Sequence, residues 1–165
     1  ATIALQAAHL CRQLTGETPR VAMLSFSTKG SAVTPGTEKV AAAAALARQQ
    51  AQARHLAIEI DGELEADAAL LPGAARNKSV AGTVAGRANV LVFPDLHSGH
   101  IGGKLTAILG HCAYGQIITG LTKPAADVSR ADSPETIAAV AAIVGLQAIE
   151  MRRLQEMAEE EKKKS

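Results

Sequence analysis

Short apolar runs of strand length alternate with helix-like segments along most of this chain, and this alternation constrains the fold more than any other feature. Four runs are predicted as strands, at residues 20–27, 56–60, 89–93 and 114–121. Helical spacing or strong helix propensity marks the main segments that precede, separate and follow them, at residues 1–14, 35–52, about 99–109 and 133–161. Strands that alternate with helices are joined by crossover connections, which make neighbouring strands parallel. We therefore predict an α/β fold of three layers, αβα, around a largely parallel sheet.

Helix start and stop residues support these boundaries. Gly16 stands where a helix C-cap is expected, Thr34 precedes Pro35 as an N-cap, and Ser133 precedes Pro134 in the same way. Residues 70–84 are irregular, and we expect a short helix and then a loop there.

The last helix changes character along its length. Residues 137–146 are almost wholly apolar and are expected to be buried, whereas the chain becomes charged from residue 150. We therefore predict an α/β domain at residues 1–149 and a charged helical tail at residues 150–165. Two interpretations of the tail remain open: a solvated helix end, or a helix that pairs with a partner through Met151, Leu154 and Met157.

Polar, glycine-rich residues follow two of the predicted strands within residues 90–130. Loops at the carboxyl ends of parallel strands are where ligands collect in open α/β sheets. The small-residue loop at residues 27–31 follows another strand, and it fits either an anion site or a simple turn. These loops form the candidate site.

Composition excludes several classes of function. A net charge of +1, one Tyr, two Phe and no Trp provide neither a basic surface nor stacking rings for nucleic acid. No apolar run approaches the roughly 20 residues that span a bilayer, and no signal peptide is recognisable, so we expect a cytoplasmic protein without a membrane partner. Cys11 and Cys112 are far apart and lack metal-site spacing, which predicts separate buried thiols.

Two groups of titratable residues have alternative explanations. The first group is acidic and has two explanations: metal binding or acid/base chemistry, or the start of a helix, where the helix dipole favours carboxylates. Its members are Asp61, Glu63, Glu65 and Asp67. The pair formed by His97 and His100 fits a base near neutral pH, a metal pair, or loop packing. Without further ligands in a recognisable pattern, we predict no metal site.

Three ordered blocks then resemble one family. They are residues 19–31 (PRVAMLSFSTKGS), residues 61–69 (DGELEADAA) and residues 84–96 (VAGRANVLVFPDL). Together they are similar to the phosphate acetyltransferases and the related phosphate butyryltransferases. The resemblance extends to about residue 149 and matches only the carboxyl-terminal half of the family's usual length.

The resemblance implies a fold like one lobe of the isocitrate and isopropylmalate dehydrogenases. It also implies transfer of an acetyl or other acyl group between CoA and inorganic phosphate, with CoA as a substrate and with no metal, cofactor or covalent acyl-enzyme. The expected partners are CoA or acyl-CoA, phosphate, and either a second copy of the chain or the amino-terminal half that is missing here.

Site residues follow from the same resemblance. Ser129 and Arg130 match the Ser-Arg pair that contacts substrate, and are the predicted catalytic residues. The predicted substrate and CoA contacts are Ser27, Thr28, Lys29, Gly30, Ser31, Asp95, His97, His100, Lys104, Lys123 and Asp127. Arg87 is a weaker candidate, because it precedes its strand and is expected at the opposite end of the sheet.

The chain departs from the family pattern at several of these places. Thr136 replaces an aspartate suggested as the general base, Ala107 replaces an arginine, and Ala126 and Ala131 replace an asparagine and a glycine. His97 and His100 stand where the family has asparagines. Two hypotheses therefore remain: an enzyme, or a non-catalytic acyl-CoA-binding regulatory or structural module derived from that family.

Overall fold

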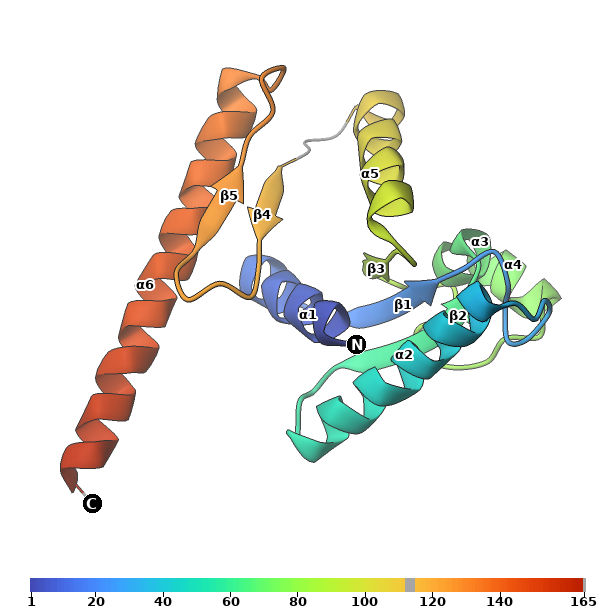
Figure 1. Ribbon diagram of the computed structural model, residues 1–165, viewed down its shortest axis with the longest axis horizontal. Helices are drawn as coiled ribbons and strands as arrows, with labels where there is room; N and C mark the ends of the chain where they lie inside the picture. The colour runs from blue at the N-terminus through green and yellow to red at the C-terminus, as the bar shows by residue number, and fades with distance from the viewer. Residues whose placement is uncertain (112–114, 165) are drawn as a thin grey trace. The chain divides into compact units, whose positions relative to one another are not determined.

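The computed structural model describes residues 1–111 and 115–164, in two compact units, Ala1–Gly102 and Gly103–Ser165. Figure 1 labels the elements along the chain. In order they are α1 (Thr2–Thr15), β1 (Arg20–Leu24), α2 (Pro35–Ala53), β2 (Glu59–Leu64), α3 (Ala66–Leu70), α4 (Pro72–Asn77), β3 (Val90–Val92), α5 (Leu96–Gly110), β4 (Gln116–Ile118), β5 (Ala125–Asp127) and α6 (Pro134–Lys164).

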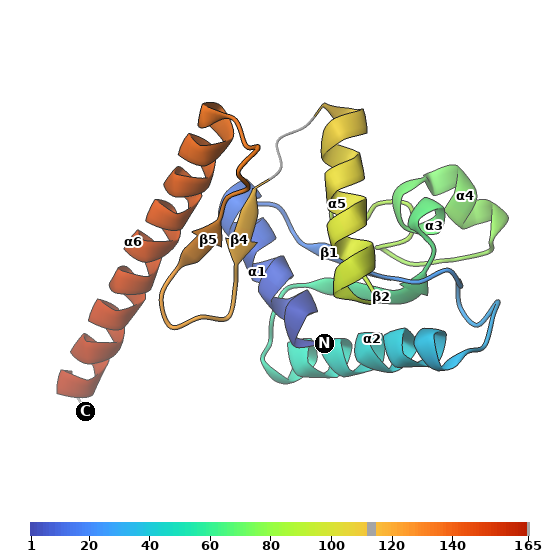
Figure 2. The same cartoon turned by 45° about the horizontal axis from the view of Figure 1, so that its top comes forward.

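The first unit contains a parallel sheet in the order β2-β1-β3. Alternate residues of β1 point to opposite faces. Val21 and Met23 join a core with α1 and α2, whereas Ala22 and Leu24 join a second core with Leu64 and with Ala69 of α3. Helices therefore cover both faces, as Figure 2 shows for α2 on one side and α3 on the other. The predicted three-layer α/β fold with a parallel sheet is confirmed for this unit.

The helix signals in the sequence act as expected. Thr34 Oγ1 accepts a hydrogen bond from the amide of Thr37 at 3.2 Å, and Thr37 Oγ1 accepts one from the amide of Thr34 at 2.9 Å. This reciprocal capping box satisfies donors that a helix start otherwise leaves unpaired. At the other end of α1, Gly16 takes the left-handed conformation and closes the helix, with its amide bonded to Arg12 O.

The second predicted strand was misplaced. It spans Glu59–Leu64 rather than residues 56–60, because pairing with β1 starts at Arg20 and Glu59 and continues to Leu64. Asp61 and Glu63 thus lie in the strand, where partners on other elements satisfy their carboxylates. The strand predicted at residues 20–27 is shorter for a related reason: residues 25–27 leave the ladder and begin the loop after β1.

The second unit contains a sheet of a different kind. β4 and β5 pair antiparallel, with Ile117 opposite Ala126, so the description "largely parallel" holds for the first unit alone. The strand predicted at residues 114–121 is Gln116–Ile118 in the described part, and Tyr114 lies outside the described residues. β5 was not predicted, because its three residues, Ala-Ala-Asp, have low strand propensity.

α6 starts at its predicted cap, where Ser133 Oγ accepts a hydrogen bond from the amide of Thr136 at 3.2 Å. The prediction that residues 137–146 are buried was wrong. Val140 is buried, whereas Ile137 and Leu146 are exposed. The reason is that α6 packs on a sheet of only two strands, which covers one side of the helix. At that contact Val140 lies against Gly115: a Cβ added to Gly115 would lie 2.4 Å from Val140 Cγ2. The other sides of the helix are not covered by this sheet. Leu154 and Met157 of the charged tail are also exposed.

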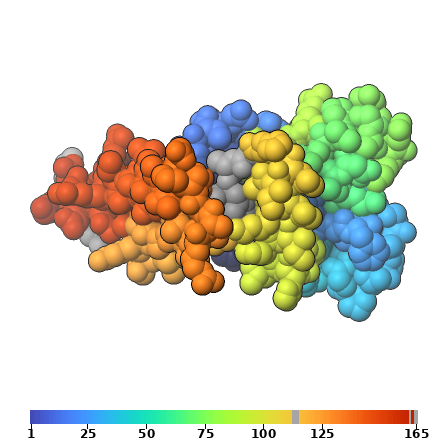
Figure 3. Space-filling view, turned by 90° about the horizontal axis from the view of Figure 1, so that it is seen from above, coloured from blue at the N-terminus to red at the C-terminus, as the bar shows by residue number. Residues whose placement is uncertain are grey.

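The helix α5 presents apolar side chains to its surroundings. Figure 3 shows this helix, in yellow, at the surface. Its large apolar residues are between 51% and 82% exposed, and they are Leu96, Ile101, Leu105, Ile108 and Leu109. Even so, among the residues that the structure describes, no helix combines the length and the apolar character needed to cross a bilayer.

Candidate functional site

The carboxyl ends of β1, β2 and β3 meet at one edge of the parallel sheet. Residues 25–34 follow β1, Glu65 follows β2, and Pro94 and Asp95 follow β3. Lys39 of α2 joins this edge, because its Nζ donates a hydrogen bond to Pro94 O at 2.8 Å. The predicted ligand-binding loops of the first unit therefore lie where an α/β sheet binds its ligands.

The loop after β1 satisfies its own backbone donors. Glu63, a buried residue of β2, accepts from the amide of Gly30 at 2.5 Å and from Ser27 Oγ at 3.1 Å, both through Oε1. The other amides of residues 28–32 bind as follows: Thr28 to Ser31 Oγ, Lys29 to Glu63 O, Ser31 to Thr28 O, and Ala32 to Ser27 Oγ. All five amides of residues 28–32 are thus bonded within the protein, one of them to the Glu63 carboxylate. Any ligand bound by this loop must be recognised by side chains.

The carboxylates of Glu65 and Asp67, at the start of α3, pair with the same lysine. Lys78 Nζ lies 2.8 Å from Glu65 Oε2 and 2.7 Å from Asp67 Oδ1. These hydrogen bonds lower the pKa of both carboxyls and raise the pKa of Lys78. Thr28 Oγ1 also donates to Glu65 Oε2 at 2.9 Å, which ties the loop to the start of α3. Within the described ranges, no three His, Cys, Asp or Glu side chains form a group suited to a metal ion.

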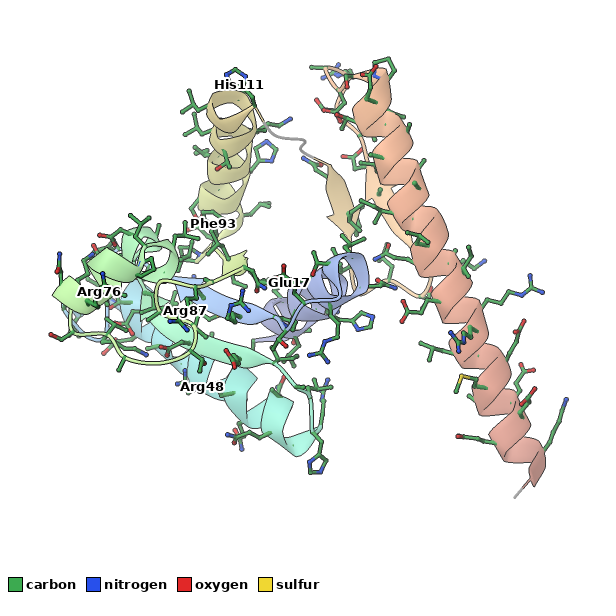
Figure 4. All side chains as sticks on the ribbon, turned by 180° about the vertical axis from the view of Figure 1, so that it is seen from behind. Glu17, Arg48, Arg76, Arg87, Phe93 and His111 are labelled. Atoms are coloured by element: carbon green, nitrogen blue, oxygen red, sulfur yellow. The ribbon has the colours of Figure 1, made fainter. Side chains whose placement is uncertain are left out.

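Asp95 caps helix α5. The amide of Ser98 donates to Asp95 Oδ1 at 2.8 Å, and Ser98 Oγ lies 3.0 Å from the same oxygen. These bonds, the backbone one first, lower the pKa of the Asp95 carboxyl. His97 and His100 follow on the first turns, and both side chains are exposed. The ring of Phe93, labelled in Figure 4, packs closely on α5: a Cβ added to Gly102 would lie 2.8 Å from the nearest atom of that ring.

Ser129 and Arg130 form a tight turn between β5 and α6. The amide of Ser129 donates to Asp132 Oδ2 at 2.6 Å, the amide of Asp132 donates to Ser129 O at 3.0 Å, and Ser129 Oγ accepts from the amide of Ala131 at 3.4 Å. The turn leaves Arg130 exposed and Ser129 partly exposed. Sequence reasoning missed Asp132, although a carboxylate placed shortly after a serine is a common turn signal.

The positions at the start of α6 serve as a helix cap. Thr136 Oγ1 lies 3.3 Å from Ser133 Oγ, and the amide of Thr136 binds the same hydroxyl. Glu135 has a lowered pKa, because its own backbone amide and then the Ser133 hydroxyl donate to its carboxylate. Thr136, at the position where the resemblance leads one to expect an aspartate, contributes a hydroxyl to the cap.

The predicted site residues are divided between the two units. Residues 27–31, Asp95, His97 and His100 belong to the first unit; Lys104, Lys123, Asp127, Ser129 and Arg130 belong to the second. Lys123 lies between β4 and β5, and Asp127 ends β5. The structure does not test whether these residues bind a ligand, so that assignment stays a prediction.

Two further expectations can be compared with the structure. Arg87 lies next to the start of β1, at the amino end of the strands, as predicted: its carbonyl accepts a hydrogen bond from Arg20 Nε at 2.6 Å. Cys11 is a free thiol that packs against the core beside α1 but is only half-buried, whereas a buried thiol was expected. Cys112 lies outside the described residues.

Comparison with known proteins identifies the family. Residues 1–145 match the family model described as "Phosphate acetyl/butaryl transferase". The chain belongs to this family. The family match therefore includes the β1 loop, the α5 start and the Ser129-Arg130 turn, and it stops within α6, so the charged end of that helix lies beyond it.

Individual relatives agree. A phosphate acetyltransferase of Acetivibrio thermocellus is 50% identical over 147 residues, which are 88% of this chain and 43% of the relative. Among solved structures, EutD phosphotransacetylase from Staphylococcus aureus has a TM-score of 0.81 at 42% identity, and a phosphotransacetylase from Streptococcus pyogenes has a TM-score of 0.80 at 44% identity. They cover 88% and 90% of this chain, but 44% of each solved chain. The chain thus spans less than half the length of these family members.

Proposed function

We propose that this chain takes part in phosphate acetyltransferase activity, the exchange of an acetyl group between CoA and inorganic phosphate. The observation that carries the proposal is the 50% identity with a phosphate acetyltransferase over 88% of the chain. CoA acts as a substrate, and the proposal includes no other cofactor. The proposed location is the cytoplasm, where CoA and phosphate are both available.

The proposed chemistry needs few groups. The CoA thiolate attacks the carbonyl carbon of acetyl phosphate, the new C–S bond forms, and the C–O bond to phosphate breaks with its electron pair leaving on phosphate. Arg130 can hold a phosphate or carbonyl oxygen through a guanidinium fork, and the Ser129 hydroxyl can donate to the oxygen on which charge develops. For the thiol proton, the chain offers the imidazoles of His97 and His100 and the carboxylate of Asp132.

The β1 loop supplies a second part of the proposal. Because its backbone amides are bonded within the protein, we assign CoA recognition there to side chains, above all to the partly exposed Lys29. The remaining predicted contacts are retained as polar groups for CoA or phosphate: Ser27, Thr28, Gly30, Ser31, Asp95, Lys104, Lys123 and Asp127. Residues 1–149 are proposed as the transferase domain, and residues 150–165 as a separate charged tail.

The proposed partners follow from the chain's length relative to its family. The relatives' polypeptides are more than twice as long as the matched region. We propose that activity requires either a second copy of this chain or a chain that supplies the amino-terminal half. A partner of this kind would be seen as a shift in molecular mass by light scattering.

The decisive experiment mixes the purified protein with acetyl phosphate and CoA and follows the formation of acetyl-CoA. Ser129→Ala and Arg130→Ala should abolish turnover. Arg153→Ala is the matched control, because Arg153 is exposed on α6 and lies beyond the family match. Equal turnover in Ser129→Ala, Arg130→Ala and the wild type would refute the assignment of the site.

A second function is favoured by one observation. Thr136 replaces a carboxylate that the resemblance associates with proton transfer, and the structure uses Thr136 in the cap of α6. A chain without that base fits a non-catalytic module that binds acyl-CoA. Binding of CoA by calorimetry without any turnover would favour this second function.

A further inference from the structure

We propose that Arg48 is a positioning residue for anionic ligands: it shares the Asp61 carboxylate with Lys29 and so allows Lys29 to leave Asp61 for a phosphate group of CoA. This inference rests on the proposed function, because it uses Lys29 as the CoA-binding side chain. Arg48 itself is not assigned a contact with the ligand.

Three elements meet at Asp61. The carboxylate belongs to β2, Lys29 lies in the loop after β1, and Arg48 projects from α2, where Figure 4 labels it. Lys29 Nζ binds Asp61 Oδ1, and Arg48 Nη1 lies 3.4 Å from the same oxygen. The amide of Gly62 also donates to Oδ1 at 2.9 Å. One carboxylate oxygen therefore has two cationic partners.

Exposure differs between the acid and its two bases. The side chain of Asp61 is 15% exposed, whereas those of Lys29 and Arg48 are 42% and 40% exposed. A carboxylate that is mostly withdrawn from water is costly to leave without a counter-charge. If Lys29 were its sole cation, transfer of Lys29 to a ligand would carry that cost. Arg48 remains beside Asp61 and so lowers the free-energy cost of moving Lys29 away.

The side chains of Lys29 and Arg48 are suited to different roles beside Asp61. Lysine carries a compact charge on a flexible stem, which can turn from one anion to another, whereas the arginine guanidinium keeps its charge and geometry. Lys29 belongs to a loop at the carboxyl edge of the sheet, where ligands are expected. Arg48 lies in the carboxyl-terminal half of α2, which is held against the sheet by the buried Ala44, Ala47 and Ala51. The mobile partner is thus Lys29 and the fixed partner is Arg48.

The test is a cycle of variants in CoA titrations by calorimetry. Lys29→Met should weaken CoA binding by about tenfold, the order of a lost charge-assisted bond. Arg48→Met should weaken it by about threefold to tenfold, since Asp61 then retains Lys29. Arg48→Met in an Asp61→Asn background should have no effect, because no carboxylate remains to retain Lys29. Arg48→Lys keeps the charge and should bind CoA nearly as the wild type does.

Each outcome decides between explanations. An equal loss from Arg48→Met in both backgrounds would mean that Arg48 contacts CoA directly, and it would overturn this inference while leaving the proposed function intact. Unchanged affinity in Arg48→Met would overturn it as well. Absence of CoA binding by the wild-type chain would refute the proposed function together with the inference. Arg54→Met, an exposed charge loss at the end of α2, is the matched control, and circular dichroism verifies that each variant is folded.

Discussion

Gly86 is the position where the addition of one methyl group should be most informative about the fold. Its backbone has φ +70°, and a Cβ there would lie 2.5 Å from Pro72 Cα and 2.7 Å from Pro72 N. Both contacts are with backbone atoms, which cannot rotate away, and the amide of Gly86 is anchored to Ala68 O at 2.8 Å. Gly86→Ala should therefore combine about 1–2 kcal/mol for a left-handed residue with about 1–3 kcal/mol of overpacking.

Gly16 provides the matched control. It has a similar φ of +72°, but a Cβ there would meet nothing within 4 Å. Gly16→Ala should cost only the backbone part, about 1–2 kcal/mol. Urea unfolding followed by circular dichroism measures both free energies, and their difference isolates the steric contribution of Pro72. Equal destabilisation in the two variants would refute the close approach of the residue-86 loop to α4.

Two further predictions concern charge and the Ser-Arg turn. Lys78 lowers the folded-state pKa of Glu65 and Asp67, so its stabilisation is present above their unfolded-state pKa and is lost as the pH falls through the folded-state values. Lys78→Met should lower the urea midpoint near neutral pH and approach the wild type in acid; a constant difference down to acidic pH would contradict this. Asp132→Ala removes the carboxylate that accepts a hydrogen bond from the Ser129 amide, and so it should misplace the Ser129-Arg130 turn. In the acetyl-CoA assay, kcat/KM should fall about tenfold to a hundredfold. Circular dichroism should show that the variant is folded.

Helix ends in both units could be predicted from local signals, and the sheet of the first unit from the order of its elements. Thr34 with Pro35, Gly16, and Ser133 with Pro134 specify helix ends through short-range hydrogen bonds and backbone preferences, and they do so whatever the rest of the chain does. The parallel sheet follows from strand–helix alternation, which depends on chain connectivity more than on individual contacts.

The errors occurred where tertiary contacts outweigh local preference. β2 contains three carboxylates, those of Glu59, Asp61 and Glu63, and a glycine, which are poor strand residues by themselves. Their partners, Lys29 and Arg48 for Asp61 and Ser27 for Glu63, come from elements distant in sequence, so no local pattern could reveal that the strand continues. The exposure of Ile137 was missed for a similar reason: an apolar run indicates burial only if other elements are wide enough to cover it.

The same limit applies to the candidate site, and it changes how the β1 loop should be understood. A run of small residues after a strand fits either a nest of amides for an anion or a simple turn, and the sequence alone leaves both interpretations open. In the structure the amides of residues 28–32 are bonded within the protein, that of Gly30 to the carboxylate of Glu63, whose role cannot be read without the fold. In the proposed function, recognition of CoA by this loop depends on the charge of Lys29, which also forms an ion pair with Asp61 and has a partly exposed side chain. In the proposed function, this loop would gain affinity from exchange between ion pairs rather than from fixed backbone donors. The strength of the internal pair would then set the affinity for CoA as much as contacts with the ligand do.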